Sequence, residues 1–303
     1  MVLVYFLCFL SIRFTAWHTG SVMYSIYKQK SFFTGGNIIH SIFIRNILSL
    51  CLFASLVWLI QLSHHWLIGA WLIVAMFFFT LFDHAMKKFI VTTLLFGIGF
   101  SVYLYALTHW TEQFPSKELE VFLNRGALIF VLIPLFCLSF FSHSPFINYW
   151  KKPKWREAIY FPFIWSGFHR TSIKAFLCIA LVINTAALAP FVIRNGWSFF
   201  EDIWLLMIIF SITNALLEEI IWRGALLSRF SEQVGEKWAV VITSIGFGLQ
   251  HYSLGFPWLI CIAFSIGGFF YGGITVKSGS LIPAVVWHLV LNMLMVLSGL
   301  ILT

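Results

Sequence analysis

Charged side chains are scarce in this sequence. Lys, Arg, Asp and Glu together account for 10% of its 303 residues, whereas roughly 25% is usual in soluble globular proteins. Hydrophobic residues account for 60% and aromatic residues for 19%. This composition excludes an ordinary soluble domain and predicts a polytopic membrane protein.

Cysteine is also rare, and it is widely spaced. There is no CxxC pair and no metal-binding spacing among the five cysteines, which are Cys8, Cys51, Cys137, Cys178 and Cys261. This excludes a cysteine-based metal motif. Because each cysteine lies in or beside an apolar run, we interpret all five as small buried hydrophobic residues.

The net charge of +8 is spread along the chain. A nucleic-acid interface needs Lys and Arg gathered on one solvated face, but here they lie between apolar runs. We therefore expect no nucleic-acid partner and interpret the basic residues as signals of membrane topology.

Apolar runs of about 17 residues or more recur along the chain, each long enough to cross a hydrocarbon core about 30 Å thick. They are unbroken rather than alternating, which favours helices over a membrane β-barrel. The predicted fold class is all-α, a polytopic membrane helical bundle of about 8–10 transmembrane helices. The first run lacks the flanks of a cleaved signal peptide, so we expect a span there. The ten runs lie near residues 1–18, 46–62, 66–83, 89–109, 126–142, 175–193, 203–229, 238–254, 257–276 and 281–302.

Basic residues predict the orientation of these runs. With both termini outside, 15 of the 19 basic residues fall on one side, which the positive-inside rule makes cytoplasmic. The sequence has little hydrophilic loop, and we expect a multi-pass integral protein of a bacterial cytoplasmic membrane. The four basic residues on the other side are Arg13, Lys117, Arg125 and Arg194.

The densest basic and aromatic run extends from Trp150 to Arg156. Each cation near anionic lipid contributes about 1 kcal/mol to membrane binding, so this segment is expected along the cytoplasmic membrane surface. It marks a boundary between two regions. Residues 1–172 supply N-terminal transmembrane helices of unknown role that end in this segment, and residues 173–303 carry the polar motifs.

Three polar motifs interrupt the apolar runs of the last third. They are Glu218-Glu219-x-x-x-Arg223, Phe247-x-x-x-His251 and His288-x-x-x-Asn292. A charged group at hydrocarbon depth costs about 2.5–3.5 kcal/mol on insertion scales, so such groups usually face a polar cavity and have a function there. Three motifs of complementary type in so apolar a chain favour an intramembrane active site.

A helix places residues four apart on one face. Glu219 and Arg223 are therefore expected to form a supporting ion pair, while Glu218 points about 100° away and is free to act as a base. If this helix continues to about Arg229, Glu218 lies roughly 17 Å from that end, at a depth similar to that of His251. Phe247 is expected beside the His251 ring.

One carboxylate, two imidazoles and an amide suit the hydrolysis of an acyl bond. Glu218 and His251 would hold and deprotonate a water molecule. His288 and Asn292 would donate hydrogen bonds to the developing oxyanion, a contribution of typically about 2.7–4 kcal/mol per donor.

Zinc catalysis is the alternative chemistry. Glu218, His251 and His288 would then form a two-histidine, one-carboxylate zinc set with an open position for water. The sequence has no His-Glu-x-x-His helix, however, and Asn is a poor zinc ligand. We therefore favour a mechanism without a metal or other cofactor.

At these motifs the sequence resembles the CPBP family of intramembrane proteases, also called Abi or CAAX protease-like, which includes CAAX prenyl endopeptidases. The matching segments, in the family's order, are Glu218–Gly224, Phe247–His251 and His288–Asn292. A glycine-rich helix and loop precede the last of them, as in the family. Trp222 departs from the family, which more often has Phe or another residue there. The resemblance covers roughly residues 175–303.

The resemblance implies an intramembrane endopeptidase of glutamic type. In that family's mechanism Glu218 and His251 activate the water, His288 and Asn292 form the oxyanion hole, and the ion pair of Glu219 and Arg223 supports the site. The expected partners are the lipid bilayer and a peptide or protein substrate that enters from it. Gly268 and Gly272 are expected to let two helices approach closely.

A catalytically silent membrane scaffold that regulates a signalling or secretion partner is the alternative function. The intact set of four catalytic side chains favours the enzyme, because a scaffold has no need of oxyanion donors. A transporter agrees less well with the sequence, since transporters commonly have paired halves and here the polar motifs occur in one half.

Overall fold

The computed structural model describes residues 35–62, 64–109 and 114–301. The run predicted near residues 1–18, with Cys8 and Arg13, lies outside the described residues. The chain divides into residues 1–45 and a compact unit of residues 46–303. All three polar motifs belong to the second unit, and the boundary predicted near residue 172 falls inside it.

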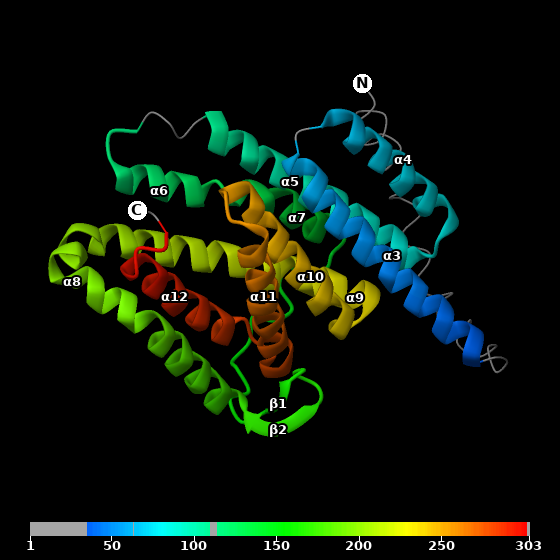
Figure 1. Cartoon of the computed structure of the whole chain (residues 1–303). Helices are drawn as coiled ribbons and strands as arrows, with labels where there is room; N and C mark the ends of the chain where they lie inside the picture. The colour runs from blue at the N-terminus through cyan, green and yellow to red at the C-terminus, as the bar shows by residue number, and fades with distance from the viewer. Residues whose placement is uncertain (1–34, 63, 110–113, 302–303) are drawn as a thin grey trace. The chain divides into compact units, whose positions relative to one another are not determined.

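Helices make up most of the described chain, which confirms the predicted all-α bundle (Figure 1). They are α3 (Gly35–Gln61), α4 (His65–Leu81), α5 (His84–His109), α6 (Lys117–Gly126), α7 (Ile129–Phe141), α8 (Ile173–Glu219), the π-helix η2 (Ile220–Leu226), α9 (Leu227–Val234), α10 (Glu236–Gln250), the 3-10 helix η3 (His251–Leu254), α11 (Trp258–Ser278) and α12 (Ile282–Leu297).

Five helical segments of the described residues are long and apolar enough to cross a membrane: Ile42–Gln61, His84–His109, Lys117–Phe141, Ile173–Val234 and Trp258–Ser278. Helices α4 and α12 are apolar but shorter. These segments agree with a multi-pass membrane protein.

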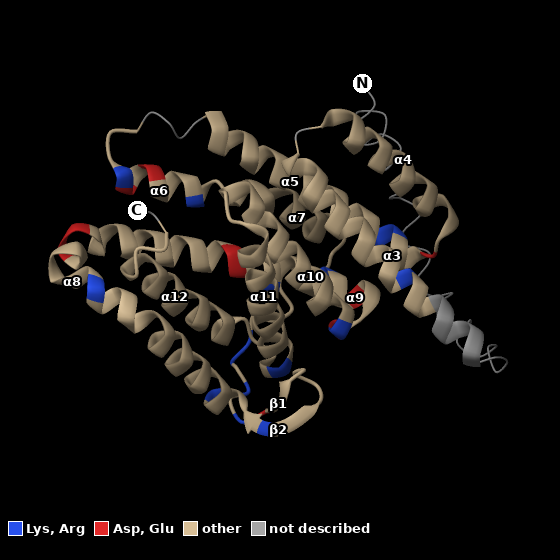
Figure 2. Ribbon diagram, viewed as in Figure 1, with Lys and Arg blue, Asp and Glu red and all other residues tan. Residues whose placement is uncertain are grey.

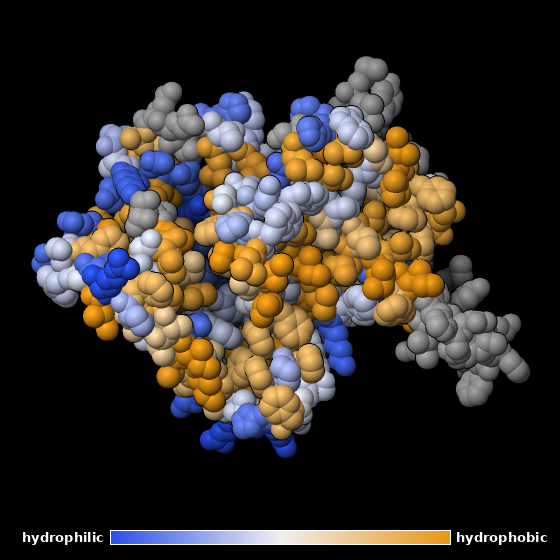
Figure 3. Space-filling view, in the orientation of Figure 1, coloured by the Kyte–Doolittle hydropathy of each residue, from blue (hydrophilic) through white to orange (hydrophobic). Residues whose placement is uncertain are grey.

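The outward-facing side chains are largely apolar. Figure 2 shows ribbons with few charged positions, most of them near helix ends and the hairpin, and Figure 3 shows broad hydrophobic areas on the visible face. Phe140 is 65% exposed and Ile193 is 77% exposed. Exposed apolar areas of this kind are unfavourable in water and favourable in a bilayer.

The cysteines correct one sequence-based interpretation. Cys261 is buried, but Cys51, Cys137 and Cys178 are exposed. In a membrane protein, the lipid-facing side of a helix is as apolar as the side that is buried inside the bundle. An apolar neighbourhood in the sequence therefore did not distinguish a buried cysteine from one on the outer face.

A glycine bends the longest helix. The φ of Gly196 is 77°, a left-handed conformation that glycine adopts without steric cost. The runs predicted near 175–193 and 203–229 are the two arms on either side of this bend, and α12 lies between them (Figure 1). Leu177 of the first arm belongs to one hydrophobic cluster with Trp287 of α12, and Phe210 of the second arm to another with Val296. This packing brings α12 beside the arm that carries the glutamates.

Aromatic rings connect the N-terminal helices to the motif-bearing helices. Trp222 of η2 is fully buried. Its ring centroid lies 6.2 Å from that of Phe53 in α3, 5.3 Å from Phe96 in α5 and 5.9 Å from Phe247 in α10, all edge-to-face. Trp222, the residue that departs from the family pattern, thus connects the N-terminal helices to the motif-bearing helices.

Glycines let α10 and α11 approach closely. A Cβ added at Gly268 would lie 3.2 Å from the Ser244 Cα, and one added at Gly272 would lie 3.1 Å from a side-chain carbon of Val240. A Cβ added at Gly248 would collide with backbone of α11. The close approach predicted for Gly268 and Gly272 is therefore confirmed.

The basic and aromatic segment leads into a β-hairpin that we did not predict. Strands β1 (Ala158–Pro162) and β2 (Gly167–Ser172) pair antiparallel. A two-stranded hairpin is marginal on its own, but Ile164 at its turn is fully buried against Gly273 of α11. The Lys154 N–H also donates to the Ser278 carbonyl at 2.9 Å. Protein contacts thus hold this segment to the end of α11.

Candidate active site

The helix that carries the two glutamates continues beyond its motif. From α8 it passes through η2 into α9 and ends at Val234, so it continues to Arg229, as expected, and five residues beyond. A π-helix is a widened turn that frequently occurs at functional sites. Glu218 and Glu219 are 2% and 0% exposed and lie where α8 meets this turn.

Glu219 and Arg223 form the predicted ion pair. The Arg223 Nη1 donates to the Glu219 Oε1 at 2.9 Å, and both side chains are buried. The Arg223 Nη2 donates to the Gly268 carbonyl at 3.3 Å, and its guanidinium lies 4.3 Å from the ring centroid of Phe247 and 5.1 Å from that of Tyr271. The carboxylate, carbonyl and ring faces together compensate the buried positive charge.

His288 lies between the two glutamates. Its Nδ1 is 2.8 Å from the Glu219 Oε1, and its Nε2 is 3.7 Å from the Glu218 Oε2. The Glu219 carboxylate, already paired with Arg223, can only accept hydrogen bonds, so the His288 Nδ1 carries a proton. The Nε2 is thereby directed toward Glu218.

His251 is fixed by its neighbours on α10 and α11. Its Nδ1 donates to the Phe247 carbonyl at 2.7 Å, which leaves a lone pair on the Nε2 of the neutral ring. Phe247 contacts the imidazole edge-to-face with centroids 4.9 Å apart, as expected from the four-residue spacing. The stacking partner is Phe264, whose centroid is 3.9 Å away.

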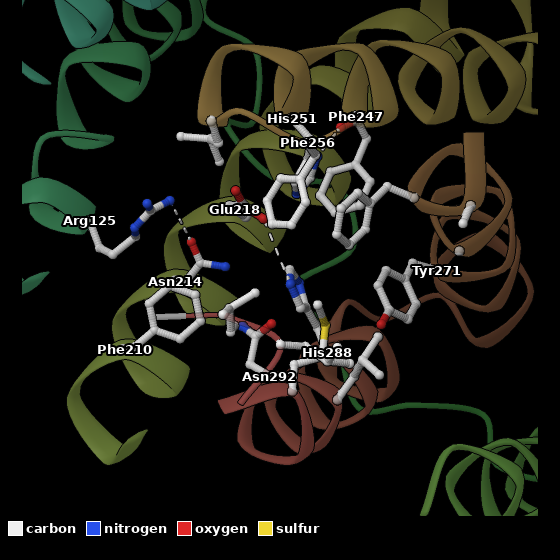
Figure 4. A pocket seen from close by; sticks show the side chains of 18 of the residues that line it. Arg125, Phe210, Asn214, Glu218, Phe247, His251, Phe256, Tyr271, His288 and Asn292 are labelled. Atoms are coloured by element: carbon white, nitrogen blue, oxygen red, sulfur yellow. Dashed lines mark hydrogen bonds and ion pairs between the residues drawn. The ribbon is translucent and has the colours of Figure 1, made fainter. Parts of the chain in front are cut away.

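One cavity of about 490 Å³ brings the predicted catalytic side chains together (Figure 4). Its lining includes Glu218, His251, His288 and Asn292, and also Phe247. In Figure 4 these side chains approach a common space from different helices. The ion pair of Glu219 and Arg223 lies outside the lining, behind His288.

Two polar atoms at this cavity have unused hydrogen-bonding capacity. The Glu218 Oε2 and the Asn292 Nδ2 are buried and have no hydrogen-bond partner among the described residues. One is an acceptor and the other a donor. Buried polar atoms are usually paired, so an unpaired acceptor and an unpaired donor at one cavity indicate a place for a ligand or water.

Gln250 is a site residue that the sequence analysis missed. Its Nε2 donates to the Glu218 Oε1 at 3.1 Å, while the other oxygen, Oε2, has no hydrogen-bond partner in the described part of the chain and lies 3.7 Å from the His288 Nε2. Gln250 directly precedes His251 in a segment matched to the family, but no spacing rule connected it to a glutamate on another helix.

Arg125 and Asn214 also line the cavity without having been predicted. Asn214 precedes Glu218 by four residues, a helical spacing that could have indicated a shared face. Arg125 comes from α6, and we had interpreted it as a topology signal on the outer side. Its Nη1 donates to the Asn214 Oδ1 at 3.4 Å. A helix of the N-terminal region thus contributes a side chain to the cavity.

The zinc alternative draws on three of the same side chains, Glu218, His251 and His288. Within the described ranges, no group of three or more His, Cys, Asp or Glu side chains is arranged to hold a metal ion. The contact of Glu219 with the His288 Nδ1 suits either chemistry, because zinc-binding histidines commonly donate their other ring N–H to a carboxylate.

In this membrane helical bundle, one cavity is lined by a buried acid, two histidines and an amide. This combination has the makeup of an intramembrane hydrolytic site. Residues 199–294 match the model of the family described as type II CAAX prenyl endopeptidase Rce1-like. The match covers about a third of the chain and includes all three motifs. It confirms, for this segment, the resemblance to CPBP intramembrane proteases, and it supports the protease class. The comparisons with curated proteins and with solved structures gave no match.

Proposed function

We propose that this protein is an intramembrane endopeptidase that hydrolyses a peptide bond of a membrane-associated peptide or protein without a metal. The observation that carries the proposal is that the Glu218 Oε2, an acceptor, and the Asn292 Nδ2, a donor, belong to residues lining one cavity and have no hydrogen-bond partner there among the residues that the structure describes. The acceptor suits a water molecule, and the donor suits the carbonyl oxygen that the water attacks.

Glu218 and His251 activate the water in this mechanism. The free Glu218 oxygen and the His251 Nε2 accept hydrogen bonds from the water and take up its proton as the oxygen attacks the carbonyl carbon. Gln250 holds the second Glu218 oxygen at 3.1 Å and so orients the carboxylate. When the C–N bond breaks, the proton returns to the leaving amine.

His288 and Asn292 stabilise the oxyanion of the tetrahedral intermediate. Asn292 donates through its Nδ2, and His288, which Glu219 holds at the Nδ1, donates through its Nε2 when that nitrogen carries a proton. Donors of this kind typically contribute about 2.7–4 kcal/mol each. Arg223 acts through Glu219, which fixes the orientation of His288.

The aromatic side chains in the cavity lining suit a substrate with apolar groups. Phe210, Phe256 and Phe264 line it beside the polar groups. Because the matching family is described as a prenyl endopeptidase, peptides with a prenylated cysteine are one substrate class to test. We place the enzyme in a bacterial cytoplasmic membrane, with the substrate entering from the bilayer.

The test uses the full chain reconstituted in liposomes. Two peptide pools are added, N-palmitoylated decapeptides and farnesyl-cysteine decapeptides, with the other positions randomised among uncharged residues. Mass spectrometry identifies new peptide termini. We expect new termini with the wild type and none with Glu218→Gln, a nearly isosteric change that removes the base.

Two outcomes would contradict the proposal. Equal cleavage by the wild type and by Glu218→Gln, with both proteins monodisperse, would exclude the proposed base. No cleavage in either pool, together with full rescue of a deletion phenotype by Glu218→Gln, would favour the silent scaffold.

A further inference from the structure

Arg125 is a cation in the wall of the catalytic cavity. It lies in the last turn of α6, and its side chain is half-buried where it lines the cavity with Asn214 and Glu218. In Figure 4 Arg125 and Asn214 lie to one side of the catalytic residues, with the guanidinium directed toward the amide. A basic side chain near a helix C-terminus interacts favourably with the negative end of the helix dipole. That role does not require the side chain to reach a cavity.

The guanidinium of Arg125 has spare hydrogen-bonding capacity. It carries five N–H donors, of which one reaches the Asn214 Oδ1 at 3.4 Å. Its Cζ lies 5.4 Å from the ring centroid of Phe210. Among the described residues, no carboxylate oxygen lies within 4.0 Å of it in an ion pair. The charge therefore faces the cavity without a close ion pair among the described residues, and Glu218 acts on it only from a greater distance.

We propose that Arg125 and Asn214 form an anion-binding subsite that holds a carboxylate of the substrate near the scissile bond. An arginine fork binds a carboxylate bidentately, which gives orientation as well as affinity. Asn214 precedes Glu218 by one helical turn, about 6 Å along the axis. An extended peptide spans about 3.3 Å per residue, so the carboxylate belongs within about two residues of the bond that is cut.

Two sources of carboxylate fit this subsite, a free C-terminus and an acidic side chain. The subsite rests on the proposed function, because it positions a peptide for cleavage by Glu218. Arg125 could alternatively act on the site through its electrostatic effect on Glu218. In that case every peptide would be affected alike.

The experiment compares three forms of the N-palmitoylated pool in the same liposomes. One form has free C-terminal carboxylates, the second has C-terminal amides, and the third has amides with one Asp at successive positions. For the wild type we expect kcat/KM for a carboxylate form to exceed that for the plain amide by about 10- to 100-fold, the range of a hydrogen bond to a charged group.

The variants separate recognition from a general effect. In Arg125→Gln, kcat/KM for the carboxylate form is expected to fall to about that for the amide form, a ratio of about 1. Arg125→Lys is expected to retain part of the preference, because a point charge replaces the planar guanidinium. Lys117→Gln changes the charge of α6 equally at a residue outside the cavity lining, and it should keep the wild-type ratio.

Each outcome has one meaning. A preference for the free C-terminus or for Asp that depends on Arg125 supports the subsite and identifies the source of its carboxylate. A ratio near 1 in the wild type, or an equal loss on all three forms in Arg125→Gln and Arg125→Lys, overturns the subsite while cleavage by Glu218 stands. Absence of Glu218-dependent cleavage from every form would instead refute the proposed function.

Discussion

Replacing Arg223 by methionine should destabilise the protein by about 3–5 kcal/mol, because Glu219 would be left as a buried charge without its cation. Arg223 is 1% exposed and Glu219 is 0% exposed, with 2.9 Å between the paired atoms. At an effective dielectric constant of about 20, their attraction is about 6 kcal/mol. Methionine retains much of the volume beside Phe247 and Tyr271, so the loss is mainly electrostatic.

The double variant Arg223→Met with Glu219→Gln tests this reasoning. Removing both charges should cost less than the sum of the two single changes, with a coupling energy at the upper end of about 0.5–3 kcal/mol. The assay is the free energy of unfolding in mixed detergent micelles, measured for the four members of the cycle. The matched control is Glu232→Gln in the pair of Arg229 and Glu232, where Glu232 is 45% exposed. That change should cost less than about 1 kcal/mol. Additive losses in the buried cycle would refute the electrostatic explanation.

Three further predictions follow from packing, orientation and chemistry. Gly248→Ala should lower the thermal midpoint or prevent folding, because its Cβ collides with α11, whereas Gly69→Ala, which has open space, should not; equal midpoints would contradict this packing. Gln250→Met should lower kcat by about 10- to 100-fold with KM little changed, because it removes a hydrogen bond that orients Glu218; a change confined to KM would argue against positioning. Treatment with 1,10-phenanthroline should leave cleavage intact, and loss that zinc restores would establish the metal mechanism instead.

Local spacing predicted what a single helix determines. The four-residue interval between Glu219 and Arg223 was enough to predict their ion pair, because the α-helical repeat continues closely enough into η2 for the side chains to meet. Unbroken apolar runs predicted the helical bundle for the same reason, since lipid requires internal hydrogen bonds. The roles of the motif residues in catalysis stay predictions.

Contacts between distant segments were not predictable in this way. Arg125 reaches the cavity because α6 packs on α8, a contact across 89 residues for which the sequence has no periodic signal. Gln250 contacts Glu218 for a similar reason, since the two residues lie 32 positions apart on different helices, α10 and α8. The hairpin escaped prediction because burial of Ile164 against α11, rather than strand length, holds it.

Trp222 determines how far this protein can be recombined with others. Its ring packs on Phe53 and Phe96 from the N-terminal helices and on Phe247 from the motif-bearing part. A chimera that joined residues 173–303 to foreign N-terminal helices would place unmatched side chains against this ring, one turn from Glu218. Such a graft should require Phe53 and Phe96 to be carried along, or Trp222 to be replaced by a smaller ring that suits the new neighbours.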